Sequence, residues 1–148
     1  NETILRRIDS EGHVLCNHTA THDYGLPVRP PERIREEIVA VSEQIRRVVP
    51  DADIAIFRAP GGRFTPELVA EADALGLTSW AWSIDPQDWR TDDPGAIVSS
   101  VLDGVSPDAV VLLHDGGGDR EATVAAVAEI IPVLTSVGYE FVGLPAEP

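Results

Sequence analysis

The sequence predicts an α/β protein built on parallel strands, and two observations support this. Helical and strand-like segments alternate along the whole chain of 148 residues, in units of the size that a strand and its crossover helix occupy. Residues 110–113, Val-Val-Leu-Leu, form a continuous apolar run, which is typical of a parallel strand buried on both faces. Parallel strands with right-handed crossovers form either a barrel or an open wound sheet, and helix–strand periodicity alone does not distinguish the two.

Each helix in the first half of the chain has a local reason to form. Residues 2–11 carry apolar side chains at helical spacing and stop at the glycine that follows. Pro31 opens a long amphipathic helix through residue 48, whose outer face of glutamates and arginines includes Glu37. Thr65 caps a third helix, which ends at Gly76. The inner face of the long helix is predicted to hold Ile34, Ile38, Val41 and Ile45. The intervening segments are predicted strands over 13–16 and 53–57 and a loop over 23–30.

The second half of the chain repeats the pattern. A strand is predicted over residues 77–84, a helix begins at Asp93-Pro94 and runs to about residue 102, and the apolar run 110–113 follows. A helix over residues 121–137 ends at a glycine, and the last strand is predicted over residues 139–142. In both halves, polar motifs stand directly after the strands, at the edge where barrels and wound sheets place their ligand sites.

Composition argues against some classes of partner. The net charge is −14 and the sequence pI is about 4.4, which argues against nucleic acid or anionic lipid because both need a basic surface, whereas a neutral glycan does not. No apolar run has the length of a membrane span. Cys16 is the only cysteine, so no disulfide forms within the chain, and its place on a predicted strand indicates a buried apolar role.

Four polar motifs carry the candidate chemistry. The first holds His18 and His22, four residues apart, a spacing that places two imidazoles on one side of a helical turn and within reach of one metal ion. By itself this spacing has low specificity, since such pairs are commonly packed or surface histidines. Each of the other three motifs ends a strand-like run. They are Arg58-Ala59-Pro60-Gly61-Gly62, Asp85-Pro86-Gln87-Asp88-Trp89 and His114-Asp115-Gly116-Gly117-Gly118.

In this order, the four motifs resemble those of the polysaccharide deacetylases, the NodB homology domain or carbohydrate esterase family 4. The family's motifs read His-(Ser/Thr)-x-x-His, Arg-x-Pro, Asp-Trp and Leu-x-His, and the resemblance covers nearly the whole chain. It implies a distorted, incomplete (β/α) barrel, of which residues 1–148 would form a single catalytic domain. The family's first motif, of the type Thr-Phe-Asp-Asp-Gly-Pro, has no counterpart in the sequence, which also contains no methionine. We therefore expect the first strands, the catalytic base and the third metal ligand to lie before Asn1.

The resemblance assigns His18 and His22 as ligands of a divalent metal, with zinc expected first and cobalt or nickel as alternatives. Two neutral imidazoles and a carboxylate leave open coordination positions for water and substrate, as in catalytic zinc sites. Such an ion activates water and polarises a carbonyl group. Thr19 or Thr21 would support the ligands without touching the metal. His13 is expected to be a packed or surface residue.

The later motifs receive the proton-transfer roles. In the family's pattern His114 would be the general acid, since an imidazole titrates near pH ~6.5 and can hold a proton at working pH. Asp88 would orient this histidine, with Asp85 as the competitor for the same role. Arg58 would hold the carboxylate of the catalytic base in one orientation.

Three residues are assigned to substrate binding. Gly61 would donate its backbone N–H to the oxyanion; the family often has an aromatic residue there, so glycine keeps the donor but loses a side-chain wall. Trp89 and Leu112 would enclose the acetyl methyl, with plain core packing as the alternative for Leu112. The glycines 116–118 are expected to form a flexible rim over the glycan groove, because the basic residue of a phosphate-binding loop is absent.

The motifs and the resemblance together predict a metal-dependent hydrolase that removes acetyl groups from a polysaccharide. N-acetylglucosamine units of a chitin-like glycan or of peptidoglycan are the expected substrate, in a secreted or cell-envelope protein of a bacterium, and residues 1–148 alone are expected to be inactive. The alternatives are a non-catalytic glycan-binding module of the same fold and an acetylxylan esterase acting on O-acetyl groups. An unrelated sugar-binding or isomerase barrel would require the four matches to be coincidental. Apolar edges left by missing strands would favour self-association.

Overall fold

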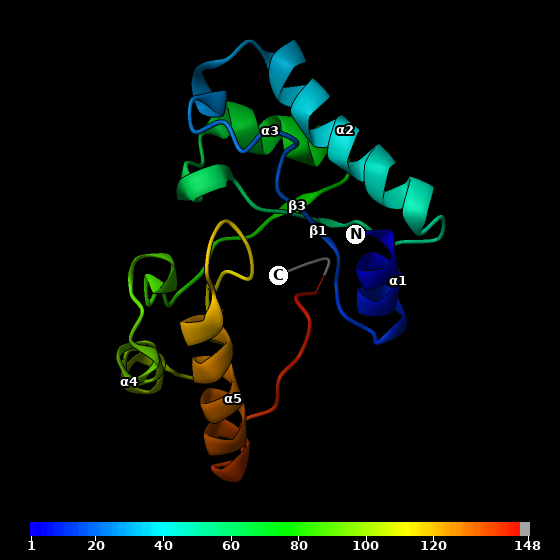
Figure 1. Ribbon diagram of the computed structural model, residues 1–148. Coiled ribbons are helices and arrows are strands. Elements are labelled where there is room, and N and C mark those ends of the chain that lie inside the picture. The colour runs from blue at the N-terminus through cyan, green and yellow to red at the C-terminus, as the bar shows by residue number, and fades with distance from the viewer. Residues whose placement is uncertain (146–148) are drawn as a thin grey trace. The chain divides into compact units, whose positions relative to one another are not determined.

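The computed structural model describes residues 1–145 (Figure 1). The chain divides into two compact units, which are described separately. The N-terminal unit consists of residues 1–81 and the segment that begins at Gly143, and the C-terminal unit consists of residues 82–142. The single domain expected over residues 1–148 stays a prediction.

The N-terminal unit is built on three parallel strands in the order β1-β2-β3. The strands are β1 (Cys16–Asn17), β2 (Ile56–Phe57) and β3 (Thr78–Ser79). Helix α2 (Pro31–Val48) leads from β1 to β2 and α3 (Pro66–Ala74) leads from β2 to β3, so each parallel pair has a helical crossover (Figure 1). The predicted α/β organisation with parallel strands is confirmed.

These strands are shorter than the predicted segments 13–16, 53–57 and 77–84. Ladder hydrogen bonds form only where neighbouring strands overlap in register, and here the overlap is limited to two residues of each strand. Residues outside the ladder still contribute to the core; Ile54, for example, is buried. The apolar runs therefore predict burial correctly and overestimate pairing.

Helix α2 has the bounds that the sequence predicts, because Pro31 supplies the fixed φ of a first helical residue. On its inner face Ile34, Ile38 and Ile45 are buried, and Val41 is half-buried against the same core. Helices α2 and α3 lie side by side (Figure 1). Their apolar faces form one cluster with the fully buried Phe57 of β2.

Three smaller elements complete this unit. Helix α1 (Glu2–Ser10) ends one residue before the predicted segment, and its Leu5 and Ile8 pack on the core while remaining half exposed. The turn η1 (Leu26–Val28) interrupts the predicted loop, because the proline within it fixes a helical φ. The turn η2 (Pro60–Gly62) follows β2 directly.

The C-terminal unit is built on two packed helices, α4 (Pro94–Gly104) and α5 (Glu121–Ser136) (Figure 1). Asp93 caps α4, as its carboxylate accepts a hydrogen bond from the Gly95 N–H at 2.9 Å. The turn η3 (Asp88–Arg90) precedes α4 and contacts α5. The apolar cluster of this unit includes Ile97, Val101, Ala126 and Ile130.

Two predicted strands of this unit are wrong. In the run 110–113, Val111 forms an isolated parallel bridge with Ile84, and only Leu112 is buried, so the run is not a strand buried on both faces. Residues 139–142 form no strand, because no other described segment pairs with their backbone. A ladder needs a neighbour, and apolar sequence alone does not supply one.

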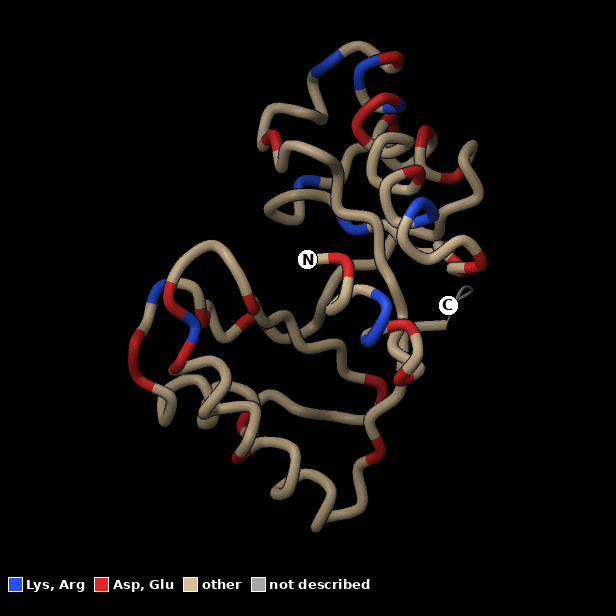
Figure 2. Tube along the Cα trace, turned by 45° about the vertical axis from the view of Figure 1, so that its right-hand side comes forward, with Lys and Arg blue, Asp and Glu red and all other residues tan. Residues whose placement is uncertain are grey.

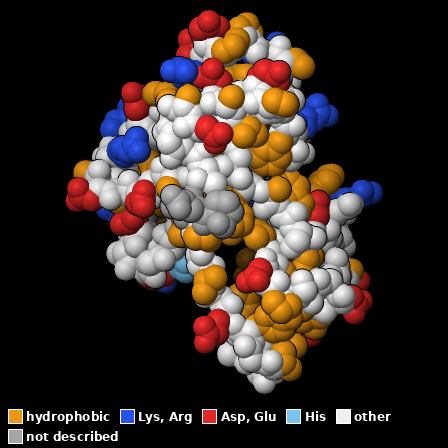
Figure 3. Space-filling model, turned by 180° about the vertical axis from the view of Figure 1, so that it is seen from behind, with side chains coloured by type: hydrophobic (Ala, Val, Ile, Leu, Met, Phe, Trp, Pro, Cys, Tyr) orange, Lys and Arg blue, Asp and Glu red, His pale blue; other side chains and the backbone are white. Residues whose placement is uncertain are grey.

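Acidic positions outnumber basic ones along the backbone of the C-terminal unit (Figure 2), and hydrophobic side chains reach the molecular surface (Figure 3). This unit holds 11 of the 25 acidic residues and only two of the 11 arginines, so it repels anionic ligands. Apolar residues also reach its surface: Val124, Ile131, Val137 and Phe141. Self-association through edges left by missing strands stays a prediction. Within residues 1–145, none of the helices combines the length and apolar character that crossing a membrane requires.

Candidate functional site

The two histidines of the first motif lie in the loop after β1, with adjacent rings. The ring centroids of His18 and His22 are 4.9 Å apart and the ring planes meet at 70°. The expected helical turn is wrong, because Thr19 and His22 have left-handed φ values of 66° and 55° and the segment is a loop. The two imidazoles are therefore adjacent because of the loop conformation, and not because a helix places residues four apart on one face.

A hydrogen bond fixes which nitrogen of His18 can bind a metal. Nδ1 lies 2.7 Å from the carbonyl oxygen of Arg58, and because a carbonyl oxygen only accepts, Nδ1 carries the proton. Nε2 then carries the lone pair, which is the form in which histidine ligates metals. The pair fits two positions of a metal site. Among the described residues, no three His, Cys, Asp or Glu side chains group closely enough to hold an ion.

The start of the histidine loop is anchored to α2 by Asn17, a residue that no sequence motif indicates. Its buried side-chain amide donates to the carbonyl oxygen of Ile38 at 2.7 Å and to the hydroxyl of Ser42 at 2.9 Å. Its amide oxygen accepts from the Thr19 N–H at 3.1 Å. A buried amide with all three groups paired fixes the backbone immediately before His18.

The end of the loop is anchored by Glu37, and the prediction that this residue faces solvent is wrong. The Glu37 side chain is 2% exposed, and its carboxylate accepts from the N–H of Thr21 at 2.8 Å and from its hydroxyl at 3.0 Å, with Arg33 as a third donor. The sequence contains a signal for this burial: residue 37 lies three positions after Ile34, so both share one helix face. Thr21 therefore holds the end of the loop through a carboxylate on α2, and its expected support of the metal ligands stays a prediction.

Replacing Glu37 with alanine should lower the free energy of unfolding by about 2 kcal/mol, since hydrogen bonds to a buried charge contribute more than neutral ones. Chemical denaturation measures this, and hydrogen exchange at the Thr21 amide should become faster. The matched control is Glu36→Ala, because Glu36 also pairs with Arg33 but is exposed, and we expect a change within about 0.5 kcal/mol. Equal effects of the two substitutions would show that the buried carboxylate does not hold the loop.

Arg58 and Gly61 follow β2. The Nε of Arg58 is buried without a hydrogen-bond partner, and no carboxylate among the described residues is within ion-pair distance of this side chain. A buried donor of this kind favours an acidic partner, in line with the expected role of Arg58 toward a catalytic base. Gly61 has φ +60° in the turn η2, a conformation that favours glycine.

Asp88 and His114 form a close pair within the C-terminal unit. The Oδ1 of Asp88 lies 2.7 Å from Nδ1 of His114, and its Oδ2 accepts from the His114 backbone N–H at 2.8 Å and from the hydroxyl of Thr123 at 2.9 Å. The competitor Asp85 is exposed and accepts from the N–H of Gln87 instead. The structure therefore places Asp88, and not Asp85, at the histidine.

The surroundings of Asp88 keep it ionised. Burial alone would raise the pKa of this carboxyl, but the hydrogen bonds from the ring and backbone of His114 and from Thr123 outweigh burial, and the net pKa is lowered. A carboxylate only accepts hydrogen bonds, so Nδ1 of His114 carries the proton. Nε2 is then the nitrogen that can exchange a proton with a substrate.

The other predicted contact residues differ in exposure. The Trp89 ring is half exposed, with the guanidinium of Arg90 5.7 Å from its centroid. Leu112 is buried, and both of its predicted roles, enclosing the acetyl methyl and plain core packing, stay predictions. The glycines 116–118 form an exposed turn that Arg120 closes by donating to the carbonyl oxygen of Gly116 at 2.9 Å.

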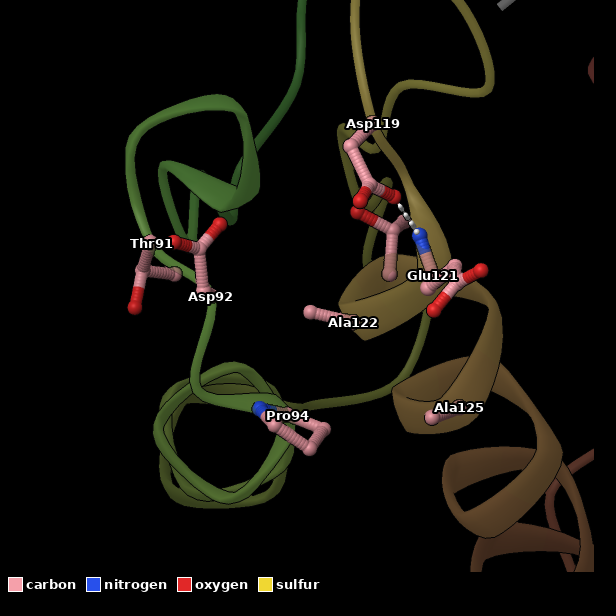
Figure 4. A pocket seen from close by; sticks show the side chains of 8 residues that line it. Thr91, Asp92, Pro94, Asp119, Glu121, Ala122 and Ala125 are labelled. Atoms are coloured by element: carbon pink, nitrogen blue, oxygen red, sulfur yellow. Dashed lines mark hydrogen bonds between the residues drawn. The ribbon is translucent and has the colours of Figure 1, made fainter.

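A pocket of about 320 Å³ opens beside the start of α5 (Figure 4). Asp92, Asp119 and Glu121 line it, and the Asp119 carboxylate accepts from the Glu121 N–H at 2.9 Å. None of the predicted site residues lines this pocket, although Thr123, the hydrogen-bond partner of Asp88, does. The pocket is therefore separate from the predicted contact residues of this unit.

Comparison with known sequences gives consistent matches. The polysaccharide deacetylase family model matches residues 1–80. The chain is 37% identical to a chitooligosaccharide deacetylase of Bradyrhizobium sp., covering 96% of this chain and 69% of that protein. It is 34% identical to a peptidoglycan-N-acetylglucosamine deacetylase of Bacillus cereus, covering 96% of this chain and 66% of that protein.

Solved structures match over nearly the whole chain. A peptidoglycan N-acetylglucosamine deacetylase has a TM-score of 0.90 at 31% identity, covering 98% of this chain and 67% of that one. A family 4 acetyl xylan esterase from Clostridium thermocellum, in complex with a cobalt ion, has a TM-score of 0.86 at 29% identity, covering 96% and 67%. A mutant of a family 4 pseudoenzyme with restored enzymatic activity has a TM-score of 0.85 at 25% identity, covering 95% and 49%. The chain thus spans between about half and 70% of the proteins that it matches.

Proposed function

Because the chain belongs to the polysaccharide deacetylases of carbohydrate esterase family 4 and has their NodB-type (β/α) barrel fold, as the sequence predicts, we propose that the protein is a metal-dependent N-deacetylase of a polysaccharide. The proposed substrate is a glycan with N-acetylglucosamine units, chitin-like or peptidoglycan, because relatives of both kinds match over nearly the whole chain. The observation that carries the proposal is the pair of adjacent imidazoles, His18 and His22, with His18 held in the metal-binding tautomer.

The N-terminal unit would bind the metal and stabilise the oxyanion. The family is one of divalent-metal-dependent hydrolases. A zinc ion, or cobalt or nickel, would lower the pKa of a water molecule so that it loses a proton and becomes a nucleophile, and would polarise the acyl carbonyl. His18 and His22 would present their ring nitrogens as ligands. Arg58 would hold the carboxylate of a general base through its planar guanidinium. The N–H of Gly61 would donate a hydrogen bond to the oxyanion.

The C-terminal unit would supply the proton for the leaving group. His114 would deliver it from Nε2 to the departing amine, while Asp88 keeps the proton on Nδ1 and the ring in one orientation. Trp89 and Leu112 would enclose the acetyl methyl in a small apolar pocket, and this pocket would exclude bulkier acyl chains.

Acetate release by the protein at its natural length tests this proposal. Chitooligosaccharides and peptidoglycan are the substrates, and acetylated xylan is the comparison substrate. We expect chelation of metal ions to abolish acetate release and addition of zinc, cobalt or nickel to restore it. Activity that is unchanged after complete metal removal would contradict the proposal. Faster release from xylan would favour an O-acetyl esterase.

A non-catalytic glycan-binding protein is the second candidate. Two observations favour it: a family 4 pseudoenzyme is among the structural relatives, and no described carboxylate completes a metal site with His18 and His22. This candidate predicts glycan binding without acetate release at any metal concentration. We propose a secreted or cell-envelope location for either candidate, because a peptidoglycan deacetylase is among the relatives.

A further inference from the structure

Tyr24 is a half-exposed aromatic residue that lies outside the four motifs, in the loop between β1 and α2. Its ring meets the ring of His22 edge-on, with centroids 5.1 Å apart and planes at 89°. The guanidinium of Arg63 lies 5.6 Å from the centroid of the Tyr24 ring, and Nη1 of Arg63 donates to the Tyr24 carbonyl oxygen at 3.2 Å. Contacts with the histidine loop and with the segment after β2 therefore hold the ring in place, while 54% of the residue stays exposed.

Tyr24 also occupies the space above Gly61. A Cβ atom at residue 61 would lie 2.6 Å from Cε1 and 2.8 Å from Cδ1 of Tyr24, distances that real Cβ contacts do not show. The left-handed φ of Gly61 adds a second reason for glycine there. One aromatic ring thus adjoins both a proposed metal ligand, His22, and the residue proposed to donate to the oxyanion.

We propose that Tyr24 contacts the substrate and forms the aromatic wall of the sugar subsite beside His22 and Gly61. This inference rests on the proposed function. A pyranose ring has an apolar C–H face, and an aromatic ring with a negative face attracts such C–H groups while burying apolar area. Tyr24 does not belong to the apolar cluster of its unit, so core packing does not explain its place.

Three variants of the protein at its natural length test the inference. For Tyr24→Ala we expect the Kd for a chitooligosaccharide, measured by calorimetry on the metal-free protein, and the KM for deacetylation to rise by about 5- to 10-fold. We expect kcat to stay within about threefold, because the ring contacts the sugar and takes no part in proton transfer. Tyr24→Phe keeps the ring and should stay within about twofold of the wild type. The matched control is Phe141→Ala, since Phe141 is 56% exposed but belongs to the other unit.

A reciprocal exchange provides a second test. Gly61→Tyr alone should weaken glycan binding further than Tyr24→Ala, because the added side chain would collide with the Tyr24 ring from its Cβ onward. Combining Gly61→Tyr with Tyr24→Ala removes this collision and supplies an aromatic side chain from residue 61, so part of the lost affinity should return.

The outcomes separate the inference from the proposed function. If the wild type binds and deacetylates glycans and Tyr24→Ala has the same Kd and KM, the inference is overturned, even when the variant melts at a lower temperature. If the wild type neither binds nor deacetylates any of these glycans, the proposed function itself fails. A rise in Kd and KM confined to the Tyr24→Ala variant supports the inference.

Discussion

Replacing Asp88 with asparagine should lower kcat/KM for deacetylation by about 10³- to 10⁴-fold while the fold is retained, as in enzymes whose histidine loses the acid that orients it. The hydrogen bonds around Asp88 explain the size of the effect. Both carboxylate oxygens of Asp88 face donors: the ring nitrogen of His114 on one side, and the backbone N–H of His114 and the hydroxyl of Thr123 on the other. An asparagine amide has to turn its NH₂ group toward one of these donors.

Either orientation of the asparagine disturbs His114. With NH₂ toward the ring, Nδ1 has to accept and its proton moves to Nε2. The ring then cannot hold protons on both nitrogens, which is the form that the proposed general acid requires. With NH₂ toward the backbone N–H, two donors oppose each other in a buried site. Nuclear magnetic resonance of the His114 side-chain nitrogens reports which of them carries the proton, and we expect the change of tautomer in the variant.

The control for this prediction is Asp85→Asn. Asp85 is exposed and accepts only a local hydrogen bond from Gln87, so kcat/KM should change by less than about threefold. A loss of activity in Asp88→Asn below tenfold, with the tautomer of His114 unchanged, would contradict the role proposed for this pair.

Replacing His18 with alanine should lower metal affinity by more than about 100-fold and acetate release by about 10³-fold. The substitution removes the proposed ligand whose tautomer the Arg58 carbonyl fixes, and leaves His22 as the only described ligand candidate in the loop. A metal titration followed by calorimetry measures the first effect, and acetate release at saturating metal measures the second.

The matched control for His18 is His13→Ala. His13 is an exposed histidine close to Glu11, as the sequence predicts, and has no place in the proposed site. Metal affinity and activity should both remain within about twofold of the wild type. Equal losses in the two variants would indicate that metal binding does not depend on the histidine loop.

Local patterns predict the parts of the fold that local physics determines. The bounds of α2 follow from Pro31 and from apolar residues at helical spacing. Thr65 caps α3 and α4 begins after Asp93, both as predicted. The short strands could not be predicted, because a ladder ends where the neighbour ends and the neighbour lies far away in sequence. For the same reason residues 139–142 read as a strand from their apolar side chains and form none.

In the candidate site too, local patterns predict some residues and miss others. The motifs identify His18, His22, Asp88 and His114, and within each unit the two members of a pair lie close together, although their chemical roles remain proposals. The side chains that hold these residues come from distant segments. Glu37 meets the histidine loop across 16 residues, and no pattern around residue 21 indicates it.

The hydroxyl of Thr123 links the apolar core of the C-terminal unit to the Asp88–His114 pair. It belongs to the first turn of α5, the helix whose Ala126 and Ile130 fill the core, and it also holds the carboxylate behind the imidazole. Any repacking that shifts the start of this helix also shifts Asp88 and, with it, the proposed proton donor His114. An engineer who redesigns α5 for heat resistance would therefore also alter the proposed catalytic pair, and would do best to keep the first turn of α5 unchanged.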